Sequence, residues 1–367
     1  SDAASITRLT SSWTTTAGSP DADVLDDLSR LRGRSRDLAR NNGHASGIIG
    51  AIVNNVVGTG IRLQSQADGE RLGLSEDATD ALRDAQEAVW SRWAKRCDAA
   101  GGLTLYALER QVCRQLLENG EAFLVRAAVK GRPLRTAWMP IEADRVDSPP
   151  EWDYRRDVDV RKGIELGAQG ERLAYWILPH HPGDDRAMRP RMPQRVPAFD
   201  KDGRPNVLHI YDQRRPGQRR GVPFLRPVMG YFEHLSQYLE AELVAARIAA
   251  CFAVIINEDG DGGIGAGHGE LTTVDGQVVE SLEPGMILRG SGITPTQVKP
   301  DRPGDTFAPF VENVLRAIAA GCELPYEIIS KDFSKSNYSN MRGAFLEARR
   351  FFRILQQMIS DGLVLPS

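Results

Sequence analysis

The feature that most restricts the fold is a helical pattern of unusual length between residues 223 and 250. Its sequence, PFLRPVMGYFEHLSQYLEAELVAARIAA, repeats apolar side chains at steps of three and four, at Phe232, Leu235, Leu239, Leu243 and Ala246. Because a helix rises about 1.5 Å per residue, such a segment extends roughly 35 to 40 Å. This length is typical of a pillar and exceeds that of most helices packed inside a globular domain.

A small β-containing insert follows the long helix. Its β-like runs are CFAVIIN, GQVVESLE and GMILRG, with the glycine-rich stretch EDGDGGIGAGHGE after the first of them. A second helical pattern covers residues 306–320, where one apolar stripe contains Phe307, Phe310, Val311, Val314, Leu315 and Ile318. The sequence therefore predicts two helices that flank a β insert.

The first two hundred residues have a different pattern. Residues 1–23 are rich in Ser and Thr and contain a lone Trp13 without periodicity, which indicates an extended arm. Helical spacing then occupies 26–40, 48–57, 76–96 and 103–119. The alternating runs EAFLVRAAV, TAWMPIEADRV and ERLAYWILPH predict strands of an antiparallel sheet. We therefore expect an α+β fold.

Composition limits the functional classes. With 367 residues, 41% of them hydrophobic, the chain can bury a large core in two or three structural units. Its net charge of −3 argues against a globally basic nucleic-acid binder. Four widely spaced cysteines suggest neither a disulfide framework nor a zinc site, so a reducing cytosol is expected. No apolar run approaches the roughly 20 residues of a membrane span, and the start SDAAS, without Met, indicates a trimmed or processed product.

Positive charge is concentrated between Pro182 and Arg226, where eleven Arg and Lys residues face five Asp residues. The many Pro and Gly residues there predict an extended, exposed connection. Its arginines could pair with neighbouring carboxylates in a solvated loop, or they could face phosphates or an acidic partner. The local sequence leaves both interpretations open.

Motifs of catalysis and cofactor binding are incomplete in this sequence. The glycines of GDGGIG fit the spacing of a dinucleotide loop, but a strand-like run follows them in place of the required helix. His180 and His181 are adjacent, so on a strand they point to opposite faces, and no HExxH or cysteine partner accompanies them. The sequence contains no phosphate-binding GxxxxGK[ST] and no GxSxG elbow. We therefore expect no enzyme activity, no cofactor and no metal.

The stretch DFSKSNYSNMRGAFLEARRFFR, residues 332–353, joins a polar loop to an amphipathic helix. We expect Ser339 or Asn340 to cap that helix. At about 100° per residue, one polar face contains Arg342, Arg349, Arg350, Arg353, Gln356 and Gln357. The opposite face, expected to pack on the rest of the chain, contains Met341, Phe345, Ala348, Phe352 and Ile359. An ordinary amphipathic helix with solvated arginines is the simpler interpretation.

Five segments carry a family resemblance. They are LRGRSRDLARNNGHASGIIGAIVNNVVGTGI, RKGIELGAQGERLAYWILPHHPGD, VLHIYDQRRPGQRRGVPFLRPVM, YLEAELVAARIAACFAVI and LPYEIISKDFSKSNYSNMRGAFLEARR. Together, and in this order, they resemble the lambda family of tailed-phage portal proteins across nearly the whole chain. Such proteins are dodecameric rings at one capsid vertex, through which the terminase motor pumps double-stranded DNA.

The resemblance implies a portal fold, in which an α+β wing is joined to long stem helices, a small β-containing clip and a tunnel helix. The implied parts are an N-terminal arm (1–23), the wing (24–222), a stem helix (223–250), the clip (251–305), a second stem helix (306–325), and a wing return with tunnel loop and tunnel helix (326–367). The family's crown is expected to be absent from this chain.

The same resemblance assigns roles to residues. It implies that the channel is lined by Ser334, Lys335, Ser336, Asn337, Tyr338, Ser339, Asn340, Arg342, Arg349 and Arg353. Subunit contacts are expected at Trp13, Arg214, Arg215, Arg219 and Arg220, with most of these arginines bridging subunits through carboxylates. The clip is expected to pair between subunits, with Val254, Ile256 and Val279 buried there.

The implied partners are further copies in a ring, double-stranded DNA without sequence preference, the terminase large subunit, major capsid and scaffold proteins, and head-completion or tail proteins. The implied location is the virion, with the host cytoplasm during assembly, and no membrane is involved. Two alternatives remain: a scaffold or adaptor without a channel, and a portal fused to a capsid protease. The Ser–Lys signature of that protease is not visible in the sequence.

Overall fold

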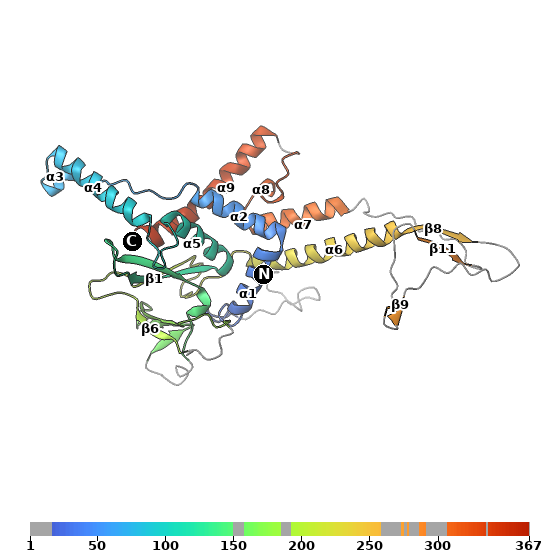
Figure 1. Ribbon diagram of the computed structural model, residues 1–367, viewed down its shortest axis with the longest axis horizontal. Helices are drawn as coiled ribbons and strands as arrows, with labels where there is room; N and C mark the ends of the chain where they lie inside the picture. Colours follow the sequence, from blue (N-terminus) through green and yellow to red (C-terminus); the bar gives the residue numbers. More distant parts are fainter. Residues whose placement is uncertain are drawn as a thin grey trace. The chain divides into compact units, whose positions relative to one another are not determined.

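The computed structural model describes residues 17–149, 158–184, 192–257, 307–334 and 337–366, and the strand segments 273–274, 277–278 and 286–290. The chain divides into two compact units (Figure 1). One consists of Ser1–Met229 and Ala319–Ser367, and the other of Gly230–Ile318. Each has its own architecture.

Three helices form a packed layer in the first unit: α1 (Leu28–Asn41), α2 (Gly43–Val57) and α5 (Leu105–Asn119). Asn42 separates the first two, because its side-chain oxygen accepts a hydrogen bond from the Ala45 N–H at 2.9 Å and caps α2. Most of α2 is apolar and buried, as at Ile49 and Ile52. It ends before Gly58, whose φ of 54° is accessible to glycine at little cost.

Two further helices, α3 (Gly69–Leu72) and α4 (Glu76–Ala94), follow the α2 segment. Ser75 caps α4 by accepting a hydrogen bond from the Ala78 N–H at 3.3 Å. Only Thr79 and Trp93 of this 19-residue helix are buried. Most of α4 is therefore in contact with solvent.

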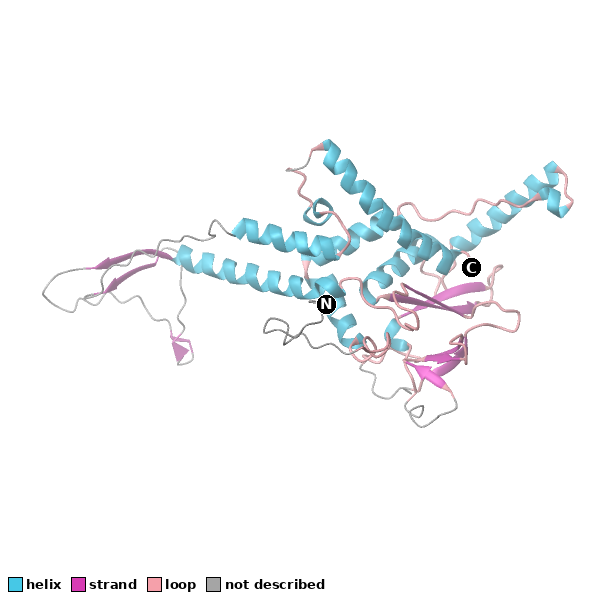
Figure 2. Ribbon diagram, turned by 180° about the vertical axis from the view of Figure 1, so that it is seen from behind, coloured by secondary structure: helices cyan, strands magenta, loops and turns pink. Residues whose placement is uncertain are grey.

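Two antiparallel sheets complete the core. The first has the order β2–β1–β7, and the second the order β3–β4–β5–β6. Figure 2 draws the strands in magenta. Their strands are β1 (Glu121–Ala128), β2 (Thr136–Ile141), β3 (Asp159–Arg161), β4 (Ile164–Leu166), β5 (Arg172–Ile177), β6 (Gln194–Pro197) and β7 (Val207–Tyr211). Phe123 lies opposite both Ile141 and His209 in the first sheet. It shares an apolar cluster with Ile164 and Tyr175 of the second, so one core joins the sheets.

The turn between α5 and β1 depends on glycine. Gly120 has a φ of 83°, and a Cβ atom there would lie 2.1 Å from the backbone carbon of Val222. A larger residue at this position would force two backbones apart. This close approach brings residues 220–222 against the start of β1, where Glu121 lies.

The chain returns to the first unit after Ile318. It forms α8 (Tyr326–Ser330), α9 (Tyr338–Ile359) and a terminal π-helical turn, η5 (Ser360–Val364). Helix α9 packs on α2, α5 and β7. Two short 3₁₀ turns also belong to the described chain. The turn η2 (Ala143–Arg145) follows β2, and the turn η4 (Arg226–Val228) precedes the long helix.

The second unit contains helix α6 (Met229–Cys251) and helix α7 (Phe307–Gly321), which run side by side (Figure 1). The ring of Tyr238 on α6 lies 5.8 Å from that of Phe307 and 4.7 Å from that of Phe310 on α7. Strands β8 (Phe252–Asn257) and β11 (Met286–Gly290) pair in parallel, and β9 (Thr273–Val274) pairs with β10 (Gln277–Val278).

The α+β prediction is confirmed, and the second helix of the pair was located to within one residue. The start of the long helix was wrong: α6 begins at Met229, not at residue 223. Pro227 explains the difference, because proline supplies no N–H and suits the 3₁₀ turn Arg226–Val228 that precedes α6. None of the described helices is both long and apolar enough to cross a membrane.

Candidate functional site

Helix α9 carries the predicted polar surface. Its N-cap is Asn337, whose side-chain oxygen accepts a hydrogen bond from the Asn340 N–H at 2.9 Å. The expectation that Ser339 or Asn340 caps the helix is therefore wrong. Both lie inside the first turn, because the helix starts at Tyr338.

The apolar face of α9 packs only along its C-terminal half. Ala348, Phe352 and Ile359 are buried as predicted. Phe345 is 40% exposed, so the expectation that it packs on the chain is wrong, whereas Met341 is half-buried. The periodicity identified the face correctly, but the described chain supplies no cover for its first turns.

The arginine face of α9 is exposed. Arg342, Arg349, Arg350 and Arg353 all lie on the surface, and the described residues offer none of them an ion pair. The helix carries Glu347 as its one carboxylate, so its charge is strongly positive. A hollow of about 360 Å³ is lined by Met341, Arg342, Phe345, Leu346 and Arg349. The helix can therefore offer guanidinium groups to an external anion.

Two glutamines on this polar face have internal partners. Gln356 donates a hydrogen bond to the Val56 carbonyl at 2.9 Å and so satisfies one of the last carbonyls of α2. Gln357 donates to Asp361 at 2.7 Å. Gln356 therefore anchors α9 to α2, and the free polar surface is narrower than the sequence pattern indicated.

The four arginines before the long helix find partners inside the chain. Arg215 pairs with Asp23 at 2.7 Å, and Arg214 with Asp212 at 2.8 Å, all well exposed. The Arg219 backbone N–H donates to Asp21 at 3.1 Å, and its side chain donates to the Gly170 carbonyl.

Arg220 is only 1% exposed and pairs with Glu121 of the same chain at 2.7 Å. The expectation that Arg220 bridges subunits is wrong, because its guanidinium is enclosed in the core of its own subunit. The local sequence gave no sign of this partner, which lies 99 residues away.

Glu121 is the centre of a buried charge cluster. Its carboxylate accepts hydrogen bonds from Arg220, Arg32 and the Gly221 N–H, and lies 2.9 Å from His209 Nε2. Burial alone would raise the pKa of Glu121, but Arg220 and Arg32 outweigh burial and hold it well below the usual range. Burial also lowers the pKa of Arg32 to about 10, so Arg32 stays charged near neutral pH.

His209 completes this cluster as a neutral ring. Burial lowers the pKa of His209 to about 4 against the opposing effect of Glu121. Its Nδ1 atom is buried without a hydrogen-bond partner, so a proton there would gain no acceptor. Phe123 and Tyr211 stack on the ring at 4.1 and 4.5 Å between centroids. The cluster links α1, β1 and β7 and is structural.

His181 lies near two carboxylates, at 3.4 Å from Glu142 and 3.5 Å from Asp144. This grouping has the residue types of a metal site. Arg36, however, pairs with Asp144 and lies 3.6 Å from Glu142, so a guanidinium already supplies the positive charge. We assign no metal to this cluster.

Several predicted residues lie outside the part of the structure that is described. They are Trp13, Val279, Lys335 and Ser336, and the side chains of Val254, Ile256 and Tyr338. Their expected roles stay predictions. Ser334, Asn337, Ser339 and Asn340 are described, and all four are exposed next to the start of α9.

Comparison with known families gives a match across most of the chain. The family described as phage portal protein, lambda family, matches residues 7–356. The chain is 28% identical over 368 residues to a probable portal protein of Halomonas phage phiHAP-1, covering 98% of this chain and 69% of the relative. It is 25% identical to portal protein B of Escherichia phage lambda, covering 93% of this chain and 68% of that protein.

The fold was also compared with solved structures. A chain from the virion of a native gene transfer agent particle aligns with a TM-score of 0.47 and 16% identity, covering 87% of this chain and 74% of that one. A chain from the neck of the native particle, computed with twelve-fold symmetry, aligns with a TM-score of 0.44 and 14% identity, covering 87% and 74%.

Proposed function

The chain belongs to the lambda family of phage portal proteins, and from this premise we propose that it forms a ring-shaped channel for double-stranded DNA at one capsid vertex. Portal proteins are structural components of the phage head and connect head and tail. They are not enzymes, which agrees with the sequence-based expectation of no catalytic site. The proposal includes three further points: the ring has twelve subunits, terminase packages DNA through it, and the DNA is later ejected through it.

The arginine face of α9 carries the proposed channel contact. Arg342, Arg349 and Arg353 are exposed and have no carboxylate partner among the described residues, so their charge is available to phosphates. Contacts to phosphate carry no sequence information, which suits a channel that must pass any genome. The exposed residues Ser334 and Asn337 to Asn340, with Lys335 and Ser336, would extend this surface as a tunnel loop.

The contact should be weak, because packaging requires each phosphate to bind and leave as the duplex advances. The net charge of −3 for the whole chain limits the overall attraction for DNA. Local positive charge on α9 therefore guides the duplex without holding it.

Charge reversal tests this proposal. The triple variant Arg342→Glu, Arg349→Glu and Arg353→Glu should package or retain less DNA, because phosphates would be repelled, while ring assembly stays normal. DNA per particle and native mass spectrometry of the ring are the two measurements. Lysine at the same three positions is the matched control, since it keeps the charge. Full packaging by the glutamate variant would contradict the channel role.

The remaining partners are proposed on the basis of the family. Residues 251–305 would form the clip, with Val254, Ile256 and Val279 at a contact between subunits, and would present the surface for terminase and head-completion or tail proteins. The wing would meet the major capsid and scaffold proteins. Arg214, Arg215 and Arg219 could still contact a neighbouring subunit, although each already has a partner in its own chain. The protein would reside in the virion and, during assembly, in the host cytoplasm.

The alternative proposal is an adaptor without a channel. It would share the helices and sheets but need not close into a ring. Negative-stain imaging separates the two, because a portal shows closed rings with a central hole and an adaptor does not.

A further inference from the structure

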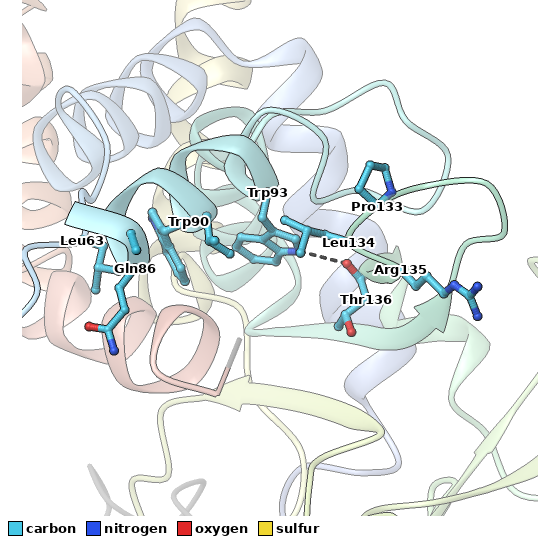
Figure 3. A pocket seen from close by; sticks show the side chains of 10 residues that line it. Leu63, Gln86, Trp90, Trp93, Pro133, Leu134, Arg135 and Thr136 are labelled. Carbon is cyan, nitrogen blue, oxygen red and sulfur yellow. Dashed lines mark hydrogen bonds between the residues drawn. The ribbon is translucent and has the colours of Figure 1, made fainter. Parts of the chain in front are cut away.

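An apolar hollow of about 690 Å³ lies beside the C-terminal half of α4. Figure 3 shows Trp90 and Trp93 of α4 in it, with Leu63 on one side and Leu134 on the other. We call this hollow the α4 groove; it is lined by Leu63, Ala85, Gln86, Val89, Trp90, Trp93, Pro133, Leu134, Arg135 and Thr136. Trp93 is buried, but Val89 is 42% exposed and Leu134 is 36% exposed. The lining thus runs from the core to the surface.

Hydrogen bonds hold both sides of the α4 groove in place. On one side the Trp93 indole N–H donates to the Thr136 carbonyl at 2.9 Å, and Arg132 donates to the Asp98 carbonyl at 2.7 Å. On the other side the Ser65 N–H donates to Glu87 at 2.9 Å, and Arg83 donates to the Ala67 carbonyl at 2.8 Å. The groove is therefore formed before any ligand arrives, which reduces the ordering cost of binding.

Along most of its length, helix α4 is not covered by the described residues. Only two side chains of this 19-residue helix are buried, whereas most of the stability of helices in proteins comes from the packing of an apolar face. A contiguous exposed apolar patch marks an interaction site in many soluble proteins. The helix and its groove therefore offer an uncovered apolar surface to a partner.

We propose that the α4 groove receives the N-terminal segment of a neighbouring copy, with Trp13 inserted between the two sides of the groove. Among residues 1–16, the large apolar side chains are Ile6, Leu9 and Trp13. Asp2 and Arg8 are the charged side chains of this segment, so its side-chain charge is zero and suits an apolar site. Tryptophan buries a large area with few rotatable bonds, which makes it an effective anchor.

The start of the described chain indicates why a neighbour supplies the segment. The Gly18 carbonyl accepts a hydrogen bond from Arg215 at 3.2 Å, and Asp21 pairs with Arg161 at 3.3 Å. These contacts fix residues 18–21 against β3 and the loop before α6, which contribute no residue to the α4 groove. Trp13 lies five residues before Gly18, so at about 3.3 to 3.6 Å per residue it can lie at most about 16 to 18 Å from Gly18. The groove that receives Trp13 must therefore belong to a subunit that packs close to residues 18–21. The existence of that subunit rests on the ring proposed above.

Photo-crosslinking between two distinguishable copies tests the inference. One copy carries a benzophenone-bearing phenylalanine in place of Trp13 and the substitution Leu134→Asp, which blocks its own groove. The other copy is affinity-tagged and otherwise unchanged. The two are produced together as full chains, irradiated and digested, and crosslinked peptides are mapped by mass spectrometry. The expected result is attachment to α4-groove residues of the tagged copy.

Moving Leu134→Asp to the tagged copy should lower this crosslink about tenfold, since a charge would enter the apolar site. Leu72→Asp in the tagged copy is the matched control, because Leu72 is 58% exposed and lies outside the groove, and it should leave the yield unchanged. Attachment elsewhere, attachment within one copy only, or no attachment in assembled rings would overturn the inference. Absence of rings in native mass spectra would instead contradict the proposed function.

Discussion

Two groups of arginines differ in where their charge is satisfied. Arg220 is buried, pairs with Glu121 and donates to the carbonyls of Ala143 and Val146, both at 2.9 Å. Arg349 on α9 is exposed and has no carboxylate partner in the described part of the chain. The charge of Arg220 is used inside the fold, whereas the charge of Arg349 remains available to an outside anion. The partner, more than the number of arginines in a segment, therefore decides which ones can bind phosphate.

The largest effect on stability should come from a substitution in the buried charge cluster around Glu121. Glu121→Gln removes the negative charge that Arg32 and Arg220 share. It leaves the buried Arg220 without a carboxylate partner among the described residues, and Arg32 with Asp144 alone, at 3.4 Å. Loss of one partner of a buried ion pair costs about 3 to 5 kcal/mol in free energy of unfolding. Denaturant unfolding of the wing should show a loss of this size.

The matched control for this change is Glu347→Gln on α9. Glu347 is exposed, so its loss should alter the free energy of unfolding by about 0.5 kcal/mol or less. If Glu121→Gln cost no more than Glu347→Gln, the buried cluster would not be the structural link that its geometry indicates.

The second-largest effect should be a loss in the free energy of unfolding at acidic pH. The pKa of His209 is about 4 in the folded chain, against about 6.5 in an unfolded one. The unfolded state thus binds more protons between these values, so the free energy of unfolding should fall as pH drops from about 6.5 to 4. The part due to His209 is at most about 3 kcal/mol.

Replacing His209 by glutamine removes this titration while keeping an N–H donor for Glu121. The plot of unfolding free energy against pH should then be flatter between pH 6.5 and 4 than in the parent protein. Comparing the two proteins cancels the titration of the remaining carboxylates. Equal slopes would show that His209 does not stay neutral in the folded cluster.

The sequence predicted those elements whose signal is local. Helix α7 was located to within one residue because one apolar stripe runs along it, whereas strands β3, β4 and β6 are only three or four residues long and gave no pattern. The pairing of Arg220 with Glu121 could not be predicted, because the partners are brought together by the close approach at Gly120. Periodicity also identified the apolar face of α9 but could not show that Phe345 stays uncovered.

The smallest effect should distinguish a paired from an unpaired exposed arginine. Arg349→Gln and Arg214→Gln should each change the free energy of unfolding by about 0.5 kcal/mol or less, since exposed charges contribute little to stability.

The binding of a short DNA duplex to the assembled protein should distinguish the Arg349→Gln variant from the Arg214→Gln variant. If Arg349 binds phosphate, its replacement lowers the slope of log affinity against log salt by about 0.9 for each phosphate that is no longer neutralised. Arg214 pairs with Asp212, so its replacement should leave that slope nearly unchanged. Identical slopes for the two variants would mean that the absence of a carboxylate partner does not mark the arginines that meet DNA.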